Sequence, residues 1–563
     1  MRARPVLLLL LLCSATAIIL AFSATGCGSA APGASGAEGL TPPDGVAQVT
    51  RDRITIDEKT GERYVKDEAL LYLDPSMTQA ELNAALAEVD GRVVGGVPEV
   101  GLFQIRMNGV VSRAGLDRKI AQLTDRGVSL AVPNTVVPEP TTDFVEPEVS
   151  ARRVTDDSLL NWGSTGTTRH WQHLQSNAVD AWDSVTGSTS VKLAVADFNW
   201  PLDHPDLLDN LTAKTSFDDD YSGGWHGIHV SGIVAGQGNN AQGITGVCWD
   251  ADLRYYDIAV ASGGGSYSAI IAAFVSAAEA GCRAVNFSGG HPGGTSVQNL
   301  MRPVVQHCGS LGCVVVTSAG NNTVDAATDS WKGLGSDPTV TNLLVVGSLS
   351  PTSWNVDHWE YELSGFSNYG ASVNIVAPGS PILSTAESGG APAYITTGGT
   401  SMSSPYVAGA VGLVASVSPG LNAQQLRDTI VNSASETLTG PDGVDMPVLD
   451  VDAAIGLAPD TGLPIAVLSA DQTNHAAAPA TVVFDPRASG PGEGDTVTGW
   501  TLDFGDGSAP ATGAGLPAAT VSHDYTTAGV FQAKLSVTNT SGKTDAQSLI
   551  ISVGVGDLPV IID

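Results

Sequence analysis

The sequence predicts three folding units, with an α/β domain on a parallel sheet at the centre of the chain. Between about residues 159 and 458, short runs rich in Val and Ala alternate with Ala-rich helical stretches. Such alternation predicts a doubly wound parallel sheet with helices on both faces. Residues 59–138 mix strand-like and helix-like runs, which predicts a small α+β domain, and residues 463–555 carry short alternating strands typical of a β-sandwich. A chain of 563 residues is also too long for one ordinary core.

The N-terminal segment, residues 1–27, predicts export. A basic start, MRARPV, precedes a long apolar run and a small-residue end at Cys27. The ending ATGC resembles a bacterial lipobox, whose cysteine is lipidated, although Ala24 stands where such motifs usually carry Leu; a plain secretory signal is the alternative. Because no later run is long and apolar enough to span a bilayer, we expect membrane contact through a lipid anchor only. The protein is then a cell-envelope lipoprotein before processing, or secreted.

The next segments surround the α+β domain. Residues 28–58 begin with a stretch rich in Gly, Ala, Ser and Pro, and we expect them to form a flexible tether. Residues 139–158 are Pro-rich and charged, which favours an exposed, cleavable linker. Within it, Arg152 and Arg153 form a dibasic candidate for cleavage.

Charge and cysteine content exclude some classes of function. Acidic residues outnumber basic ones 58 to 26, for a formal charge of -32, so we expect no nucleic-acid partner. Outside the signal segment the chain has an even number of cysteines, which predicts two disulfides in an oxidising compartment. The sequence does not choose among the three possible ways of pairing them. A metal centre on these cysteines is disfavoured, since no CxxC pair or nearby histidines accompany them. They are Cys248, Cys282, Cys308 and Cys313.

Polar residues end three of the predicted strands. Asp197 closes VKLAVAD, Ser288 and Gly289 follow RAVNF, and Asn321 closes CVVVTSAGN. Because loops at the carboxyl ends of parallel strands converge on one crevice, these residues should lie along one edge.

Two further motifs supply a histidine and a serine. His226 opens a helix in GGWHGIHVSGIVAG, and Ser401 precedes Pro405 in GGTSMSSPYV. The order Asp197, His226, Ser401 in these contexts resembles the subtilisin family of serine endopeptidases. The resemblance implies that Ser401 attacks the peptide carbonyl, His226 takes its proton and Asp197 fixes the imidazole tautomer.

The same resemblance implies roles for the other strand ends. Asn321 matches the amide that stabilises the oxyanion. Ser288, Gly289 and Gly290 resemble the segment that pairs with an extended substrate. Since Gly289 has no side chain, it predicts extra room beside the groove.

Two residues depart from the family pattern. Phe198 stands after the catalytic Asp where the family usually carries Thr or Ser, which removes a hydroxyl that would support the carboxylate. Ile228 replaces the usual Thr in HGTHVAG. Neither change deletes a triad residue, so a working enzyme with an altered aspartate environment is expected.

Calcium is the cofactor that the resemblance suggests. Asp206 in HPDL and Asn240 in GNNAQG align with a family site where oxygen ligands bind a hard cation. Plain turn formation is the alternative for this loop, and no organic cofactor is expected.

The flanking domains also have family counterparts. The α+β domain resembles subtilisin propeptides, which are intramolecular chaperones and inhibitors, so the chain's own propeptide is an expected partner besides protein and peptide substrates. The C-terminal segment, with WTLDFGDGS and HDYTTAGVF, resembles PKD modules and would bind a protein or polysaccharide or act as a spacer. Two alternatives are a non-catalytic adhesion protein on the same fold and a Ser-Glu-Asp acid peptidase, the latter disfavoured by His226.

Overall fold

The computed structural model describes residue 40 and most residues from 42 to 554, with longer gaps at 139–170, 199–202, 218–223, 353–359, 459–463 and 492–495. The signal segment with Cys27 lies outside the described residues. So does the linker with Arg152 and Arg153, which leaves their roles as predictions. Among the described residues, no helix combines the length and apolar character needed to cross a membrane.

Residues 54–137 form an α+β unit on an antiparallel sheet. The order of its strands is β3-β4-β2-β5, and β1 lies along β2. Helix α1 begins at a capping box in which Thr78 and Glu81 satisfy each other's backbone N–H groups. The elements are β1 (Ile54–Ile56), β2 (Arg63–Leu73), α1 (Gln79–Glu88), β3 (Gly91–Val97), β4 (Leu102–Met107), α2 (Arg113–Thr124) and β5 (Val128–Val137).

The prediction of a flexible tether over residues 28–58 is wrong for the second half of that range. Val49 is buried, Arg51–Arg53 form a 3₁₀ turn, and Ile54–Ile56 pair with β2. The ITI run gives this edge strand the β-branched residues that favour extended structure. The ordered α+β unit therefore begins before residue 59.

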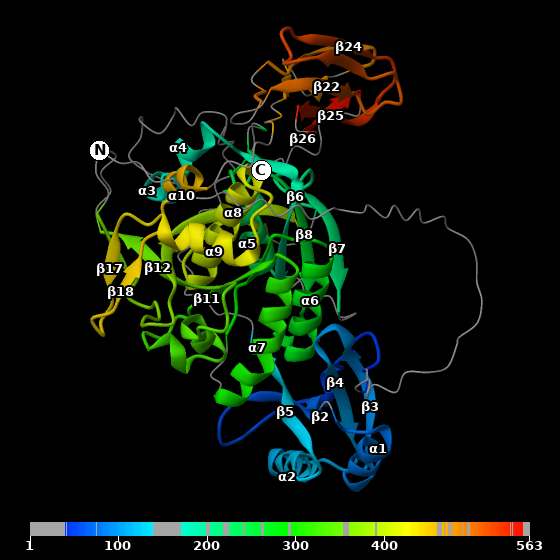
Figure 1. Ribbon diagram of the computed structural model, residues 1–563, viewed down its shortest axis with the longest axis vertical. Helices are drawn as coiled ribbons and strands as arrows, with labels where there is room; N and C mark the ends of the chain where they lie inside the picture. The colour runs from blue at the N-terminus through cyan, green and yellow to red at the C-terminus, as the bar shows by residue number, and fades with distance from the viewer. Residues whose placement is uncertain are drawn as a thin grey trace, which may run out of the picture. The chain divides into compact units, whose positions relative to one another are not determined.

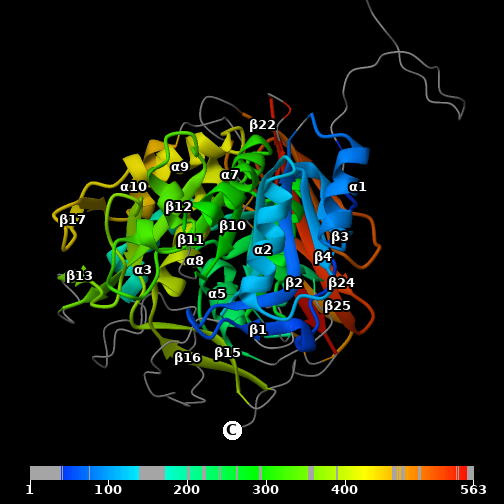
Figure 2. The ribbon, with the colours of Figure 1, turned by 90° about the horizontal axis from the view of Figure 1, so that it is seen from below.

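The central sheet is parallel, as predicted. Its order is β13-β12-β11-β10-β6-β8-β7, β14 also pairs with β12, and β13 is its one antiparallel member among the described strands. β10, β11 and β12 run side by side in Figure 2. The strands are β6 (Gly187–Asp197), β7 (Leu211–Ser216), β8 (Asp250–Asp257), β10 (Ala284–Phe287), β11 (Val314–Ser318), β12 (Leu343–Pro351), β13 (Tyr361–Leu363) and β14 (Ile375–Pro378).

Helices cover both faces of this sheet. α6 (Tyr267–Glu279) and α7 (Thr295–Ser310) lie side by side (Figure 1) and lead from β8 to β10 and from β10 to β11. α5 (His226–Ala235) lies between β7 and β8 along the chain, and α8 (Thr400–Val417) packs against it and against β6, β10, β11 and β12. α5 and α8 thus form a second pair of packed helices on the sheet.

Smaller elements complete the central domain. Two hairpins are formed by β15 with β16 and by β17 with β18. The bounds are α3 (Trp171–Gln175), α4 (Ala178–Trp182), β9 (Gly265–Ser266), β15 (Ile382–Ser388), β16 (Ala391–Thr397), α9 (Ala423–Asn432), β17 (Thr437–Thr439), β18 (Asp445–Pro447) and α10 (Val451–Leu457).

The α+β unit makes direct contacts with the central domain. β5 pairs antiparallel with β9, with Val136 opposite Ser266 and Val137 opposite Gly265. Asn134 Nδ2 donates to the hydroxyl of Ser268 at 3.1 Å. The last strand of the α+β unit thus lies beside the start of α6.

The C-terminal segment forms two sheets around a shared apolar core. One sheet has the order β19-β21-β24 and the other β20-β26-β25-β22-β23. Tyr525, which is buried, donates from its hydroxyl to the Phe504 carbonyl at 2.8 Å, and His523 stacks on the Phe504 ring. The strands are β19 (Ser469–Ala470), β20 (Asn474–His475), β21 (Ala480–Asp485), β22 (Val497–Asp503), β23 (Ala511–Ala514), β24 (Val521–Tyr525), β25 (Gly529–Asn539) and β26 (Thr544–Val553).

The predicted disulfides are wrong. Cys248, Cys282, Cys308 and Cys313 are all free thiols, and all are buried in the apolar core of the central domain. They act there as small apolar side chains. Burial raises the pKa of Cys282 and of Cys308 to about 12, so neither thiol ionises near neutral pH.

Candidate active site

Asp197 and His226 meet at the carboxyl edge of the parallel sheet. Asp197 is the last residue of β6 and His226 the first residue of α5, and both side chains are completely buried. His226 Nδ1 lies 2.7 Å from Asp197 Oδ1. A carboxylate in this position makes Nδ1 the protonated nitrogen and leaves Nε2 as the basic one.

Ser401 and Asn321 meet at the start of α8. Thr400, the first residue of that helix, donates to Asn321 Oδ1 from its backbone N–H at 2.9 Å and from its hydroxyl at 2.8 Å. Both donors hold the oxygen of the amide, so Asn321 Nδ2 is directed away from Thr400. The Asn321 side chain is therefore fixed to the first residue of α8, the residue just before Ser401.

Ser288 joins the end of β10 to the serine. Its hydroxyl donates to the Ser401 carbonyl at 2.8 Å and lies 3.0 Å from the hydroxyl of Ser404. The Ser288 side chain is completely buried. It therefore anchors α8, and only the backbone of this segment is suited to contact a substrate.

The expected room beside Gly289 is filled by the protein itself. A Cβ atom at this position would lie 2.6 Å from the Phe287 ring. The Gly289 carbonyl accepts a hydrogen bond of 2.7 Å from Lys332 Nζ. The Gly289 backbone thus lies close against the Phe287 ring, and the prediction of extra space is wrong.

The surroundings of Asp197 differ from those of a carboxylate that accepts a hydrogen bond from a neighbouring hydroxyl group. Asp197 Oδ1 also accepts from the Phe198 backbone N–H at 2.7 Å, whereas Oδ2 is buried and accepts no hydrogen bond from the described residues. The Phe198 ring packs near His226, with ring centroids 6.2 Å apart. The carboxylate is therefore held on one oxygen, and an aromatic ring packs beside its imidazole partner.

Tyr255 supports the same turn. Its hydroxyl donates to the Phe198 carbonyl at 3.0 Å. A Cβ atom at Gly227 would lie 1.9 Å from the Tyr255 hydroxyl, so a glycine after His226 is required for this contact. Ile228 is buried, and its carbonyl accepts from the Thr385 hydroxyl at 2.7 Å.

Asp206 and Asn240 meet, and both carboxylate oxygens of Asp206 accept hydrogen bonds from N–H groups. Asn240 Nδ2 donates to Asp206 Oδ1 at 3.0 Å, and the Ile244 backbone N–H donates to Oδ2 at 2.7 Å. Burial raises the pKa of Asp206 to about 6. Calcium needs several oxygen ligands, and the described part of the chain contains no cluster of three or more acidic, His or Cys side chains suited to a metal.

Two charged residues near the strand ends were missed by the sequence analysis. Lys332 is completely buried and donates to Gly289 O, to Thr317 Oγ1 and to Ser318 O. Burial lowers its pKa to about 8. Asp329 lies three residues earlier and is nearly buried. Neither belongs to a recognisable motif, so only spatial proximity reveals them.

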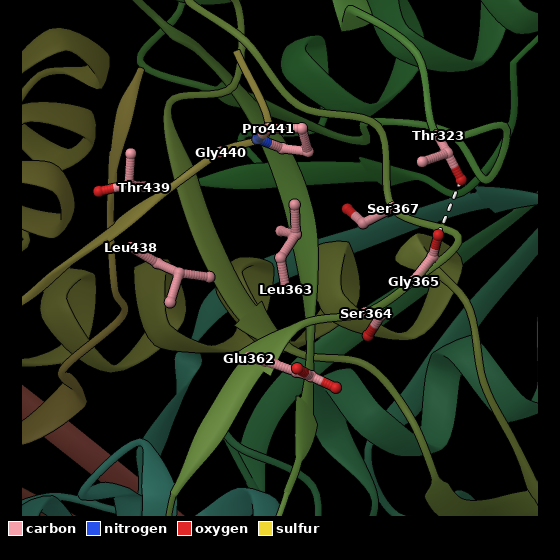
Figure 3. Close-up of a pocket in the computed structure, with 10 residues that line it drawn as sticks. All are labelled: Thr323, Glu362, Leu363, Ser364, Gly365, Ser367, Leu438, Thr439, Gly440 and Pro441. Atoms are coloured by element: carbon pink, nitrogen blue, oxygen red, sulfur yellow. Dashed lines mark hydrogen bonds between the residues drawn. The ribbon is translucent and has the colours of Figure 1, made fainter. Parts of the chain in front are cut away.

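A separate pocket of about 340 Å³ begins two residues after Asn321 (Figure 3). On one side the Thr323 hydroxyl donates to the Gly365 carbonyl at 2.8 Å, and Leu438 and Pro441 line the other side. Glu362 is its one charged lining residue. Because no second titratable side chain lines it, the pocket offers no acid–base pair that would indicate a second catalytic centre.

Comparison with protein families finds two matches. Residues 188–456 match the model of the subtilase family, and residues 463–553 match that of the PKD domain. The first range contains every predicted catalytic and oxyanion residue.

Individual relatives agree with the first match. The chain is 34% identical over 260 residues to a thermophilic serine proteinase of Bacillus sp. (strain AK1), a match that covers 46% of this chain and 59% of the relative. It is 31% identical over 276 residues to thermitase of Thermoactinomyces vulgaris, covering 48% of this chain and 90% of that protein.

One solved structure shares the fold over most of the chain. It is fervidolysin from Fervidobacterium pennivorans, a keratinolytic enzyme related to subtilisin, at 19% identity and a TM-score of 0.57. The match covers 92% of this chain and 80% of that one. At this identity it indicates a common fold.

Proposed function

The chain belongs to the subtilase family of serine endopeptidases, and from this premise we propose that it hydrolyses peptide bonds in proteins through an acyl-enzyme on Ser401. His226 takes the proton of the Ser401 hydroxyl during attack and later gives it to the leaving amine. Asp197 stabilises the imidazolium that forms in between. The observation that carries this assignment is the 2.7 Å contact between His226 Nδ1 and Asp197 Oδ1, which makes Nε2 the base.

Asn321 supplies the charge stabilisation that the tetrahedral intermediate needs. Its Oδ1 is held by Thr400, so the Nδ2 group is the end available to the oxyanion. A donor that is fixed before the reaction costs no reorganisation when charge develops. The backbone N–H of Ser401, in the first turn of α8, is the second donor.

The substrate binds as an extended strand along residues 288–290. Backbone pairing of this kind gives affinity that depends little on side chains. The two glycines at 289 and 290 allow the close approach of a second backbone.

Labelling with a fluorophosphonate tests the activity most directly. We expect the processed protein to be labelled, the label to disappear in Ser401→Ala, and to persist in the matched control Ser416→Ala, a serine on the same helix whose hydroxyl bonds to the Gly412 carbonyl. Failure of the folded, processed protein to react would favour the non-catalytic adhesion protein instead.

The α+β unit is proposed to be an inhibitory propeptide in an exported zymogen. A parallel sheet with many non-local contacts folds slowly, which favours an intramolecular chaperone. Support comes from β5, whose last residues pair with β9 of the central domain. Cleavage is proposed within residues 139–158, with Arg152 and Arg153 as candidate positions. Cys27 is proposed as the lipidated residue of the unprocessed form.

Intact mass spectrometry tests the zymogen. We expect the wild-type protein to mature to a species that begins in the linker, and Ser401→Ala to keep the unit attached. A wild-type protein that stays full-length while it hydrolyses substrates would contradict autoprocessing.

The PKD domain is proposed to bind a protein or polysaccharide near the substrate, or to space the enzyme from a surface.

A further inference from the structure

Lys332 is a buried lysine at the point where two central strands stop pairing. The parallel ladder between β10 and β11 ends with the pair Phe287 and Thr317. Beyond this pair, Lys332 Nζ donates to the Gly289 carbonyl at 2.7 Å and to the Ser318 carbonyl. It also donates to the Thr317 hydroxyl at 2.6 Å, and that hydroxyl donates to the Phe287 carbonyl at 3.0 Å. The ammonium group thus continues the connection between the two strands after their backbone ladder ends.

These contacts use every donor of the ammonium group. A lysine ammonium group has three N–H donors and accepts no hydrogen bond, and Lys332 meets three oxygen atoms. A neutral amine has only two N–H donors, so it would leave one of these oxygens without its donor. Full pairing of the two strand ends therefore needs the charged form of Lys332.

The interior opposes the charge of this side chain. Lys332 is completely buried, and burial disfavours an ammonium group. Burial lowers its pKa to about 8, against the opposing effect of the Asp329 carboxylate, the charged group that acts on it among the described residues. The nearby rings of Phe287 and Trp331 carry no charge. Because the site disfavours the charge even with three hydrogen bonds, a role in stability alone does not explain the lysine.

Gly289 is the middle residue of the segment that we propose pairs with the substrate. In a strand, successive backbone carbonyls point to opposite sides. When residues 288–290 pair as a strand, the Gly289 carbonyl faces Lys332, and the carbonyls of Ser288 and Gly290 face the opposite side, where the substrate pairs. Lys332 thus takes the place of a neighbouring strand on the side of the protein.

The same ammonium group holds the strand that leads to the oxyanion residue. Ser318 ends β11, and Asn321 follows three residues later. Lys332 therefore joins the backbone proposed to bind the substrate to the end of the strand that precedes Asn321. A misplacement of about 1 Å in such an arrangement is enough to slow a reaction severely.

We propose that Lys332 is a positioning residue that sets the substrate-pairing segment, residues 288–290, relative to the end of β11. It acts through the Gly289 carbonyl and contacts neither the substrate nor the reacting atoms. Its effect therefore depends on whether a substrate is long enough to pair with this segment. The inference rests on the proposed endopeptidase activity, which fluorophosphonate labelling tests separately.

The test compares the processed wild-type enzyme with Lys332→Met on a long and a short substrate, succinyl-Ala-Ala-Pro-Phe-p-nitroanilide and p-nitrophenyl acetate. Methionine is a long, unbranched side chain that donates no hydrogen bond. We expect kcat/KM for the peptide to fall by about tenfold or more, the effect of one lost hydrogen bond to a charged group. The rate on the acetate should stay close to that of the wild type, since the acetate has no backbone to pair and Thr400 still holds Asn321.

Lys192→Met is the matched control. It removes a lysine on β6 whose ammonium group donates to the Ala280 carbonyl at 2.9 Å. Both wild-type rates should persist in this variant.

The pH dependence gives a readout that a merely structural role would not change. As the pH rises through about 8, Lys332 loses its proton and one of its three donors. The peptide-to-acetate activity ratio of the wild-type enzyme should therefore fall between about pH 7 and pH 9.5. In Lys332→Met the ratio should stay constant over the same range.

Three results overturn the proposal: Lys332→Met that keeps the wild-type activity on the peptide, an equal loss on both substrates, or a wild-type ratio that does not change with pH. If Lys332→Met does not fold, the wild-type pH dependence alone decides. An enzyme that takes the fluorophosphonate label and gives one of these results refutes the role of Lys332 and leaves the proposed function intact.

Discussion

The Oδ1 atom of Asn321 accepts two hydrogen bonds from Thr400, one from the backbone at 2.9 Å and one from the hydroxyl at 2.8 Å. Thr400, the residue before Ser401, therefore orients the amide that we propose receives the oxyanion. This contact joins the end of β11 to the start of α8 and couples two parts of the proposed machinery.

Replacing Asn321 by Leu should lower kcat by about 10²- to 10³-fold with little change in KM, the size seen for the equivalent donor in subtilisin. The reason is that this amide interacts with the intermediate and not with the ground-state carbonyl. Steady-state kinetics with a p-nitroanilide peptide measures kcat and KM of both proteins. A large rise in KM at constant kcat would place Asn321 in ground-state binding instead.

Tyr255→Phe should destabilise the protein by about 1–3 kcal/mol, because the buried Phe198 carbonyl loses its hydrogen-bond donor. Urea unfolding in a Ser401→Ala background, which prevents self-digestion, gives this value. Tyr361→Phe, at a less buried tyrosine, is the comparison and should cost less. Equal losses would argue against a special role for the Tyr255 contact.

His204 should make the protein sensitive to acid. Its Nδ1 accepts from the Asp206 backbone N–H at 3.2 Å and its Nε2 donates to the Ala393 carbonyl at 3.0 Å, which requires the neutral ring. Burial lowers its pKa to about 4. A folded pKa below the unfolded value of 6.5 contributes stability that is present above pH 6.5 and lost as the pH falls towards 4, up to about 3 kcal/mol.

The experiment compares the unfolding free energies of the Ser401→Ala protein and of a double variant that also carries His204→Gln, each at about pH 7.5 and about pH 4.5, on either side of the titration. The protein that keeps His204 should lose more stability on acidification than the double variant does. The raised pKa of Asp206 acts with the opposite sign between about pH 4 and 6, and it cancels because both proteins contain that residue. Equal pH dependence would contradict the assignment.

The four thiols should be inert in the folded protein. Because Cys248, Cys282, Cys308 and Cys313 are buried and free, iodoacetamide should modify none of them in native buffer. After denaturation without a reductant, mass spectrometry should find all four alkylated. Unmodified pairs that react only after reduction would restore the disulfide prediction.

Chelation of calcium should leave the melting temperature unchanged if the contacts of Asp206 with Asn240 and Ile244 persist in solution. Differential scanning calorimetry of the Ser401→Ala protein with EDTA or with added calcium measures this. Stabilisation by calcium that disappears in Asp206→Ala would show instead that the loop rearranges to bind the cation.

Local patterns determined much of this protein in advance. Alternating strands and helices were enough to predict the parallel sheet, and strand ends followed by polar residues indicated which edge carries the site. The motifs around Asp197, His226 and Ser401 are short and contiguous, since the turn or helix start that presents each side chain is built from its own neighbours. For these residues the physical constraint lies within a few positions of the chain.

Only the tertiary structure decided how distant groups are used. Lys332 and Asp329 belong to no motif, because the groups that they contact lie on other segments of the chain: three oxygens at the ends of β10 and β11 for Lys332, and the Asn368 amide for Asp329. The disulfide prediction was wrong, and the calcium site stays a prediction, because each depends on whether several groups converge, which neither count nor spacing determines. Sequence by itself therefore indicated the domain order and the candidate triad, whereas packing established what surrounds the carboxylate of Asp197 and which oxygens hold Lys332.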